Sequence, residues 1–192
     1  MKKSNAYLEV IAGPMYCGKT EELIRQVKRA AIGKKPVQVF KHIIDTRYGK
    51  DRKVFSHAGL SFESELISKA KDILKYLHKK TEIVAIDEAQ WFGEDLIPVV
   101  EKLLEQGKRV IVAGLAMTYD RQPFAPIPTL MSMADKTTKL SAICTLCGEE
   151  AVFHKRIMKN GTKIDPLKAD PKLVGRTDSY EARCRNCYDR KP

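Results

Sequence analysis

The chain has 192 residues, of which 43% are hydrophobic and 31% charged, which is the composition of a globular protein with one main domain and a small appendage. No stretch approaches the ~20 apolar residues of a membrane-spanning helix, and the polar start lacks a signal-peptide pattern, so we expect a cytoplasmic protein without a membrane partner. The formal net charge of +11 comes from scattered lysines and arginines, which favours a basic surface that attracts polyphosphate substrates over a dedicated nucleic-acid-binding face.

A glycine-bounded loop near the start of the chain is the most specific motif. It consists of Gly13, Pro14, Met15, Tyr16, Cys17, Gly18, Lys19 and Thr20. An apolar run at 7–12 predicts a buried strand before it, and residues 20–31 predict a helix after it, because Leu23, Ile24 and Val27 recur at helical spacing. Backbone N–H groups of such a loop hold phosphate oxygens, while Lys19 can reach the β- and γ-phosphates and Thr20 can bind Mg²⁺. The motif therefore predicts binding of ATP with Mg²⁺, in preference to a chance turn.

Strands and helices alternate along the first part of the chain. Strands are predicted at 7–12, 37–40, 83–86 and 109–113, and helices at 20–31, 68–77 and 95–106. This alternation predicts a P-loop NTPase-like α/β fold, in which a parallel sheet carries helices on both faces. The segment 41–49 follows a strand end, where open α/β sheets bind ligands. We expect residues 50–62 to be irregular and the proline-rich stretch 123–128 to be an ordered, non-helical connection.

Two adjacent carboxylates, Asp87 and Glu88, follow the apolar strand at 83–86. An acid at the end of a buried strand is the usual magnesium partner in these folds, so Asp87 is assigned to Mg²⁺. Side chains alternate along an extended backbone, which predicts that Glu88 faces the other side and can take a proton from an attacking hydroxyl or water. The alternative is an acidic strand end that contributes only solubility.

Two Cys-X-X-Cys pairs mark the end of the chain, formed by Cys144, Cys147, Cys184 and Cys187. Each pair has the spacing with which two thiolates bind one tetrahedral metal ion, so we predict structural Zn²⁺ in preference to redox-active dithiols. The metal would clamp a loop at 149–183, which is a candidate lid over a substrate. A composition change predicts a nucleotide-binding domain at 1–139 and a zinc-binding domain at 140–192. The fifth cysteine, Cys17, is either a small residue that fits its loop or an oxidisable thiol.

Several motifs in consistent order resemble the small, zinc-containing type II thymidine kinases, from about residue 8 to residue 188. They are the loop at 13–20, Asp45-Thr46-Arg47-Tyr48, Ser56-His57-Ala58-Gly59, Asp87-Glu88-Ala89-Gln90-Trp91-Phe92, Ala113-Gly114-Leu115, Pro123-Phe124, the two cysteine pairs and Tyr180. In that family ATP phosphorylates the 5′-hydroxyl of thymidine or deoxyuridine. The resemblance implies the same activity here, a zinc-clamped lasso over the base, and a homotetramer.

The resemblance also implies roles for individual residues. Residues 13–20 would hold the phosphates with Asp45 and Arg47 close by, Asp87 would act on magnesium, and Glu88 would be the general base on the 5′-hydroxyl. Ala89 and Gln90 are assigned to the same nucleotide site. The substrate residues are Met15 and Tyr180, which would border the thymine 5-methyl group, and Leu115, Phe124, Val174 and Gly175, which would line the same pocket.

Two other functions are compatible with particular features. Asp-Glu-Ala-Gln also occurs in nucleic-acid motors, and with the net charge of +11 it would fit a nucleic-acid-binding ATPase with a zinc ribbon, although the chain is too short for a second motor lobe. The segment 116–122 departs from the family pattern, since Ala116 and Thr118 lack carboxylates and Asp120 stands where arginine is usual. A nucleotide sensor that has lost catalysis would fit these departures.

Overall fold

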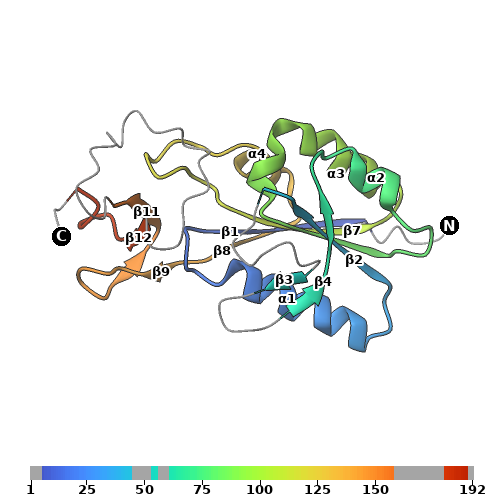
Figure 1. Cartoon of the computed structure of the whole chain (residues 1–192), viewed down its shortest axis with the longest axis horizontal. Coiled ribbons are helices and arrows are strands. Elements are labelled where there is room, and N and C mark those ends of the chain that lie inside the picture. Colours follow the sequence, from blue (N-terminus) through green and yellow to red (C-terminus); the bar gives the residue numbers. More distant parts are fainter. Residues whose placement is uncertain (1–5, 45–52, 56–60, 158–179, 190–192) are drawn as a thin grey trace.

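A six-stranded parallel sheet forms the centre of the computed structural model, which describes residues 6–44, 53–55, 61–157 and 180–189 (Figure 1). The strand order is β5-β2-β6-β7-β1-β8, and every neighbouring pair is parallel. The strands are β1 (Tyr7–Ala12), β2 (Val37–His42), β5 (Glu65–Ile67), β6 (Ile83–Asp87), β7 (Arg109–Gly114) and β8 (Lys136–Lys139). Their carboxyl ends therefore meet at one edge of the sheet, where ligands bind in open α/β folds.

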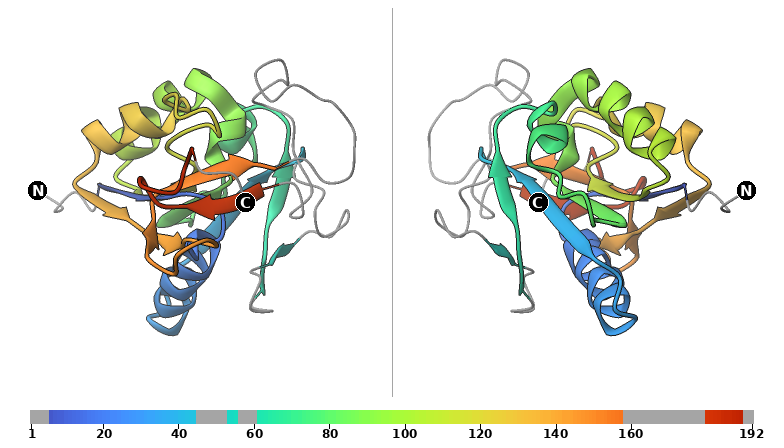
Figure 2. Two further views of the ribbon diagram at one scale, coloured as in Figure 1. Left: turned by 90° about the vertical axis from the view of Figure 1, so that its left-hand side faces the viewer. Right: turned by 90° about the vertical axis from the view of Figure 1, so that its right-hand side faces the viewer.

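Helices cover both faces of the sheet, as Figures 1 and 2 show. They are α1 (Lys19–Ile32) on one face, and α2 (Asp72–Tyr76), the 3₁₀ segment η1 (Ala89–Asp95), α3 (Leu96–Glu105) and α4 (Ile127–Met133) on the other. Alternate strand residues point into two buried clusters: Val10 packs with the α3 side, whereas Ile11 packs with Leu23 of α1. The predicted fold class is thus confirmed.

Most predicted elements are present, with two corrections in the helices. The helix expected at 68–77 is only α2, because residues 68–71 form a turn that leads into it, with hydrogen bonds from Asp72 N to Lys69 O and from Ile73 N to Ala70 O. The stretch at 123–128 is not wholly non-helical, since α4 begins at Ile127 and includes Pro128. Backbone N–H groups in the first turn of a helix have no acceptor within the helix. Proline fits at this position because it has no N–H group to leave unpaired.

The segment predicted as irregular at 50–62 contains paired backbone, which is a further correction. Its described residues form β3 (Lys53–Phe55), which is antiparallel to β4 (Ser61–Glu63). A two-stranded pairing of such short strands leaves little apolar periodicity in the sequence.

A small lobe follows the last strand of the sheet. It contains two antiparallel pairs, β9 (Ala142–Ile143) with β10 (Glu150–Ala151), and β11 (Phe153–Arg156) with β12 (Tyr180–Arg183). The domain boundary near residue 139 stays a prediction, and β8 ends at that residue. In the described part of the chain, no helix has the length and apolarity needed to cross a bilayer.

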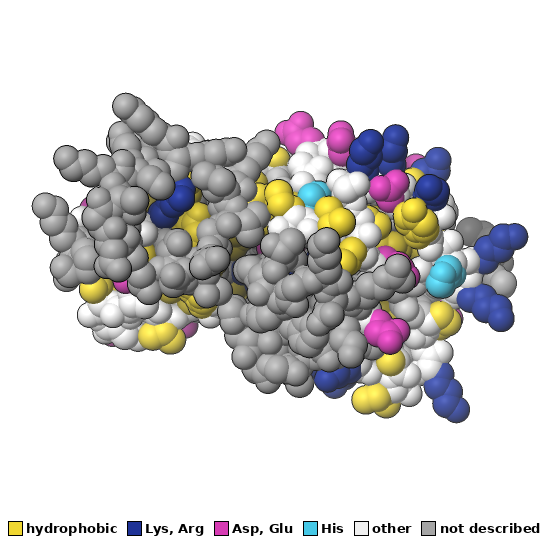
Figure 3. Space-filling view, in the orientation of Figure 1, with side chains coloured by type: hydrophobic (Ala, Val, Ile, Leu, Met, Phe, Trp, Pro, Cys, Tyr) yellow, Lys and Arg dark blue, Asp and Glu magenta, His cyan; other side chains and the backbone are white. Residues whose placement is uncertain are grey.

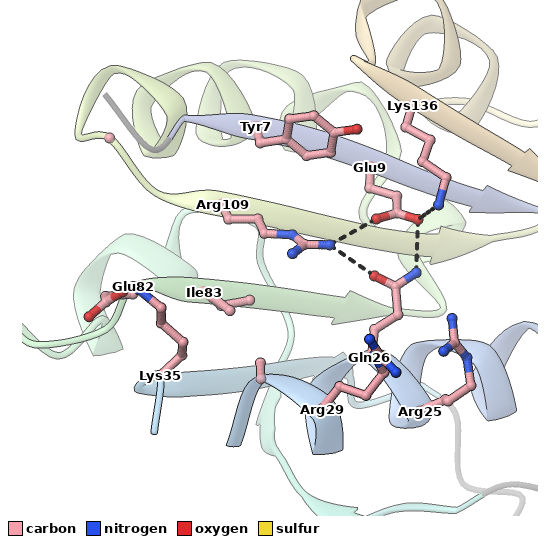
Figure 4. Close-up of a pocket in the computed structure, with 12 residues that line it drawn as sticks. Tyr7, Glu9, Arg25, Gln26, Arg29, Lys35, Glu82, Ile83, Arg109 and Lys136 are labelled. Atoms are coloured by element: carbon pink, nitrogen blue, oxygen red, sulfur yellow. Dashed lines mark hydrogen bonds and ion pairs between the residues drawn. The ribbon is translucent and has the colours of Figure 1, made fainter. Parts of the chain in front are cut away.

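A charged network lies at the start of β1, at the opposite end of that strand from the phosphate loop (Figure 4). It lines a pocket of about 720 Å³. The Glu9 carboxylate is buried and accepts hydrogen bonds from Lys136 (2.8 Å), Gln26 (2.8 Å) and Arg109 (3.1 Å). Burial alone would raise the pKa of Glu9, but these hydrogen bonds lower it. The central charges of this network are paired with one another. We therefore interpret it as a structural network that holds β1, β7, β8 and α1 together.

Candidate active site

The glycine-bounded loop closes tightly between β1 and α1. A Cβ atom on Gly13 would stand 2.5 Å from Cys17 Sγ and 2.6 Å from the Leu140 carbonyl oxygen, so only glycine fits. Gly18 caps α1 with φ 80°, and Tyr16 also has a positive φ of 66°. These turns expose backbone N–H groups beside the start of α1, the arrangement that binds phosphate oxygens.

Lys19 lies back across this loop. Its Nζ donates a hydrogen bond to the Pro14 carbonyl oxygen (2.5 Å) and lies 3.6 Å from Cys17 Sγ. The ammonium group is therefore held on the loop itself, within reach of a phosphate placed there.

Thr20 and Asp87 meet although they are 67 residues apart. The Thr20 hydroxyl donates to Asp87 Oδ2 at 3.1 Å, and the Asp87 side chain is buried at 3% exposure. Asp87 Oδ1 also accepts the backbone N–H of Glu88 at 3.0 Å. A hydroxyl and a carboxylate placed side by side next to a phosphate loop are oxygen ligands suited to Mg²⁺.

Glu88 is not in extended conformation, so the prediction that alternation turns its side chain away from Asp87 rested on the wrong geometry. Its backbone is left-handed, with φ 51° and ψ 39°, and η1 begins at the next residue. Gln90 orients the side chain instead, donating from Nε2 to Glu88 Oε2 at 2.5 Å. Gln90 is itself fixed, because its Oε1 accepts the backbone N–H of Leu115 at 3.0 Å. Glu88 remains partly exposed, whereas Asp87 is buried.

Of the residues assigned to the substrate, the structure describes Met15, Leu115, Phe124 and Tyr180. Met15 is half-buried within the loop, and Leu115 directly follows β7. Phe124 is buried and meets the Trp91 ring edge-on at 5.7 Å. Tyr180 begins β12, and its carbonyl oxygen accepts a hydrogen bond from the Tyr16 hydroxyl at 3.2 Å. The lobe is thus attached directly to the phosphate loop.

The other assignments divide into two groups. Asp45, Arg47, Val174 and Gly175 lie outside the described residues, so their roles stay predictions. Ala89 is fully buried in the apolar core beside β6, and Gln90 acts on Glu88 as described above. Neither side chain is placed as a direct phosphate ligand by these contacts.

The four cysteines of the two pairs come together in the lobe. Their sulfur atoms all lie within 4.8 Å of one another, and Cys147 Sγ is 3.6 Å from Cys184 Sγ. Tetrahedral zinc with bonds of about 2.3 Å separates its sulfur ligands by about 3.8 Å, so the cluster fits this ion. Cys17 is not part of the cluster and packs against its apolar side.

The thiols of the cluster differ in acidity. For Cys144, burial would raise the pKa, but backbone N–H groups of Cys184, Leu146 and Cys147 outweigh it and lower the pKa to about 6. Burial and the neighbouring sulfur atoms raise the pKa of Cys187 to about 12. Cys144 can therefore offer a thiolate at neutral pH, whereas a metal ion must displace a proton to bind Cys187.

Three buried polar residues were not singled out from the sequence. Lys41 is 4% exposed and lies opposite Asp87 in the ladder between β2 and β6. Arg183 is fully buried and donates to the Cys187 carbonyl oxygen at 3.3 Å, which supports the second cysteine pair. His154 is 5% exposed on β11. The sequence indicated only Lys41, which follows an apolar strand. Arg183 and His154 could not be found in this way, because their burial depends on the fold of the lobe.

The segment 116–122 that departs from the family pattern is an ordered turn. Thr118 N donates to the Gln122 carbonyl oxygen at 2.9 Å, and Arg121 has a φ of 65°. The Tyr188 hydroxyl donates to the Tyr119 carbonyl oxygen, and the Arg121 guanidinium lies over the Tyr188 ring at 4.5 Å. The turn therefore packs on the end of the second cysteine pair.

Comparison with solved structures indicates the fold. The flagellar accessory protein FlaH from Methanocaldococcus jannaschii is 12% identical, with a TM-score of 0.50, and the match covers 76% of this chain and 75% of FlaH. A DNA replication initiation factor matches 70% of this chain and 40% of its own length at 12% identity and a TM-score of 0.42.

Comparison with protein families goes further. The thymidine kinase family matches residues 6–188, which is nearly the whole chain and includes both the phosphate loop and the cysteine cluster. This protein therefore belongs to the thymidine kinase family.

Proposed function

We propose that the protein is an ATP-dependent deoxynucleoside kinase that transfers the γ-phosphate of ATP to the 5′-hydroxyl of thymidine or deoxyuridine. The proposal rests on the family match and, in the site itself, on one observation. A buried Asp87 is paired with Thr20 beside the phosphate loop, while the adjacent Glu88 is partly exposed and held by Gln90. Two neighbouring carboxylates in different environments can take different roles.

Each role follows from the placement of the side chain. The loop N–H groups and Lys19 would hold the phosphates, and Thr20 and Asp87 would hold Mg²⁺, which when bound neutralises phosphate charge. Glu88 would accept the proton of the 5′-hydroxyl as that oxygen bonds to the γ-phosphorus and the bond from phosphorus to the departing ADP oxygen breaks. Position and charge supply most of the catalysis in such a transfer.

The lobe would shape the acceptor side of the site. Zinc on the four cysteines would fix the two Cys-X-X-Cys turns, and the β11–β12 pair continues from them to Arg156 and Tyr180, the base of the proposed lasso. A homotetramer in the cytoplasm and a role in supplying DNA precursors are part of the same proposal.

A product assay separates this function from the two alternatives. The protein is incubated with ATP, Mg²⁺ and single nucleosides, and products are identified by mass. We expect thymidine or deoxyuridine monophosphate together with ADP, and none from a Lys19→Ala variant. ADP formation that requires DNA or RNA instead of a nucleoside would contradict the kinase, and ATP binding without any product would indicate a sensor.

On the face in Figure 3, lysines and arginines are interspersed with acidic side chains among the described residues, which does not favour a nucleic-acid surface.

A further inference from the structure

The β11–β12 pair has two unlike faces. On one face, Phe153 contacts the Tyr188 ring at 5.5 Å and Lys155 donates to the Tyr188 carbonyl oxygen at 2.6 Å. The alternate residues, His154 and Arg156, are on the other face, because side chains alternate along a strand. Tyr180 lies directly opposite Arg156 in the ladder, so it shares the second face.

This second face borders the phosphate loop and the substrate residues. The His154 ring meets the Tyr180 ring edge-on at 5.8 Å, and the Tyr180 backbone is joined to Tyr16 of the loop. The Lys19 ammonium is close enough for its charge to act on His154. Burial and that charge lower the pKa of His154 to about 4, so the imidazole is neutral at physiological pH.

Two polar groups of this face, the His154 ring and the Nη1 group of Arg156, have no hydrogen-bond partner among the described residues. His154 is 5% exposed, yet its ring makes no hydrogen bond with any of the described residues. On the same face, the Nη1 group of Arg156 is buried without a hydrogen-bond partner. Burying the Arg156 donor unpaired is costly, and its position beside the unpaired His154 ring, next to a phosphate loop, points to a ligand that supplies the missing hydrogen bonds.

We propose that His154 hydrogen-bonds the base of the acceptor nucleoside and thereby helps to determine which nucleosides are phosphorylated. The inference rests on the proposed function. A neutral imidazole offers one N–H donor and one nitrogen acceptor, so it can pair with a carbonyl oxygen or an N–H on the edge of a pyrimidine. A site that hydrogen-bonds its substrate discriminates against bases that lack the matching group.

Two substitutions separate hydrogen bonding from packing. His154→Phe keeps a planar ring without polar atoms, whereas His154→Gln keeps a donor and an acceptor; the exposed His78→Gln is the matched control. The Michaelis constant of His154→Phe for thymidine should rise roughly tenfold, the effect of one lost hydrogen bond, while that for ATP stays unchanged. His154→Gln should restore most of the affinity. Should His154→Phe not fold, His154→Ala removes the same polar atoms.

Direct binding provides a second readout. Trp91 is the only tryptophan and contacts Phe124 at the proposed substrate pocket, so its fluorescence can report thymidine binding without turnover. An unchanged thymidine affinity in His154→Phe would overturn the inference and leave the kinase function intact. Equal losses of thymidine and ATP affinity in both variants would also overturn it, because they indicate a structural role. If the wild type neither binds nor phosphorylates any nucleoside, the proposed function itself is wrong and the inference fails with it.

Discussion

Asp87 and Glu88 are covalent neighbours in different surroundings. Asp87 is buried and accepts hydrogen bonds from Thr20 and from the Glu88 backbone, whereas Glu88 is partly exposed and is held by Gln90. The left-handed backbone of Glu88 produces this difference, because it ends the strand and starts η1 within one residue. A non-glycine residue in this conformation is uncommon.

His154 should make stability depend on pH in a defined direction. Its pKa is about 4 in the folded protein and near 6.5 when unfolded, so only the unfolded chain takes up a proton as the pH falls below 6.5. Above pH 6.5, His154 is neutral in both states and does not change the free energy of unfolding. The free energy of unfolding of the wild type should therefore fall by about 2 kcal/mol relative to His154→Gln between pH 7 and pH 5. Urea unfolding of both proteins checks this, and parallel pH profiles would contradict it.

The roles of individual side chains could be predicted where a local sequence motif indicated them. The loop at 13–20 and Asp87 follow apolar strands, so the meeting of Thr20 with Asp87 could be expected from the fold alone. The side-chain direction of Glu88 could not, because it depends on Gln90, whose other contact, Leu115, lies 25 residues further on. His154 gave no local signal, since its burial arises from the lobe packing on the loop.

At the level of elements, the start of α1 depends on a left-handed glycine. Both Gly18 (φ 80°) and Gly107 (φ 71°) have positive φ with no overlap for an added Cβ, but only Gly18 lies in the phosphate loop. Substituting either with alanine should cost about 1 kcal/mol of stability. The cost arises from backbone strain, because alanine disfavours positive φ. Only in Gly18→Ala would relief of this strain move the phosphate loop, so only this variant should weaken ATP binding, by about fivefold. Calorimetric titration checks this, and equal ATP affinity in the two variants would contradict it.

The central strands were predictable and the edge strands were not. β6 and β7 are buried on both faces, so each is a continuous apolar run. β8 consists of Lys136, Thr137, Thr138 and Lys139, which are largely exposed, and this sequence carries no strand signal. Such an edge strand exists only because β1 offers it backbone hydrogen bonds.

At the level of the whole molecule, the lobe and the sheet are joined around the phosphate loop. Cys17 packs against the cysteine cluster, and Tyr16 bonds to the Tyr180 backbone. The lobe is therefore in direct contact with the loop at 13–20. The described cysteines offer an internal comparison, since four belong to the cluster and Cys17 does not.

Removal of one metal ligand should test the assignment of the four clustered cysteines to zinc. Cys147→Ser should lose zinc measured by atomic absorption and about 3 kcal/mol of stability, or roughly 10 °C in Tm, because metal binding energy contributes to folding. Cys17→Ser should retain one zinc per chain and the wild-type Tm. Full zinc content in Cys147→Ser, or equal zinc loss in both variants, would contradict the assignment.

The roles of the two adjacent carboxylates are tested most directly by thymidine phosphorylation in Glu88→Gln. We predict that kcat falls at least about a hundredfold, the usual effect of losing a general base, while the dissociation constant of MgATP is unchanged because Thr20 and Asp87 are intact. Asp87→Asn serves as the comparison and should weaken MgATP binding itself. A Glu88→Gln enzyme that retains wild-type kcat would contradict the account, since Glu88 would then not be the base.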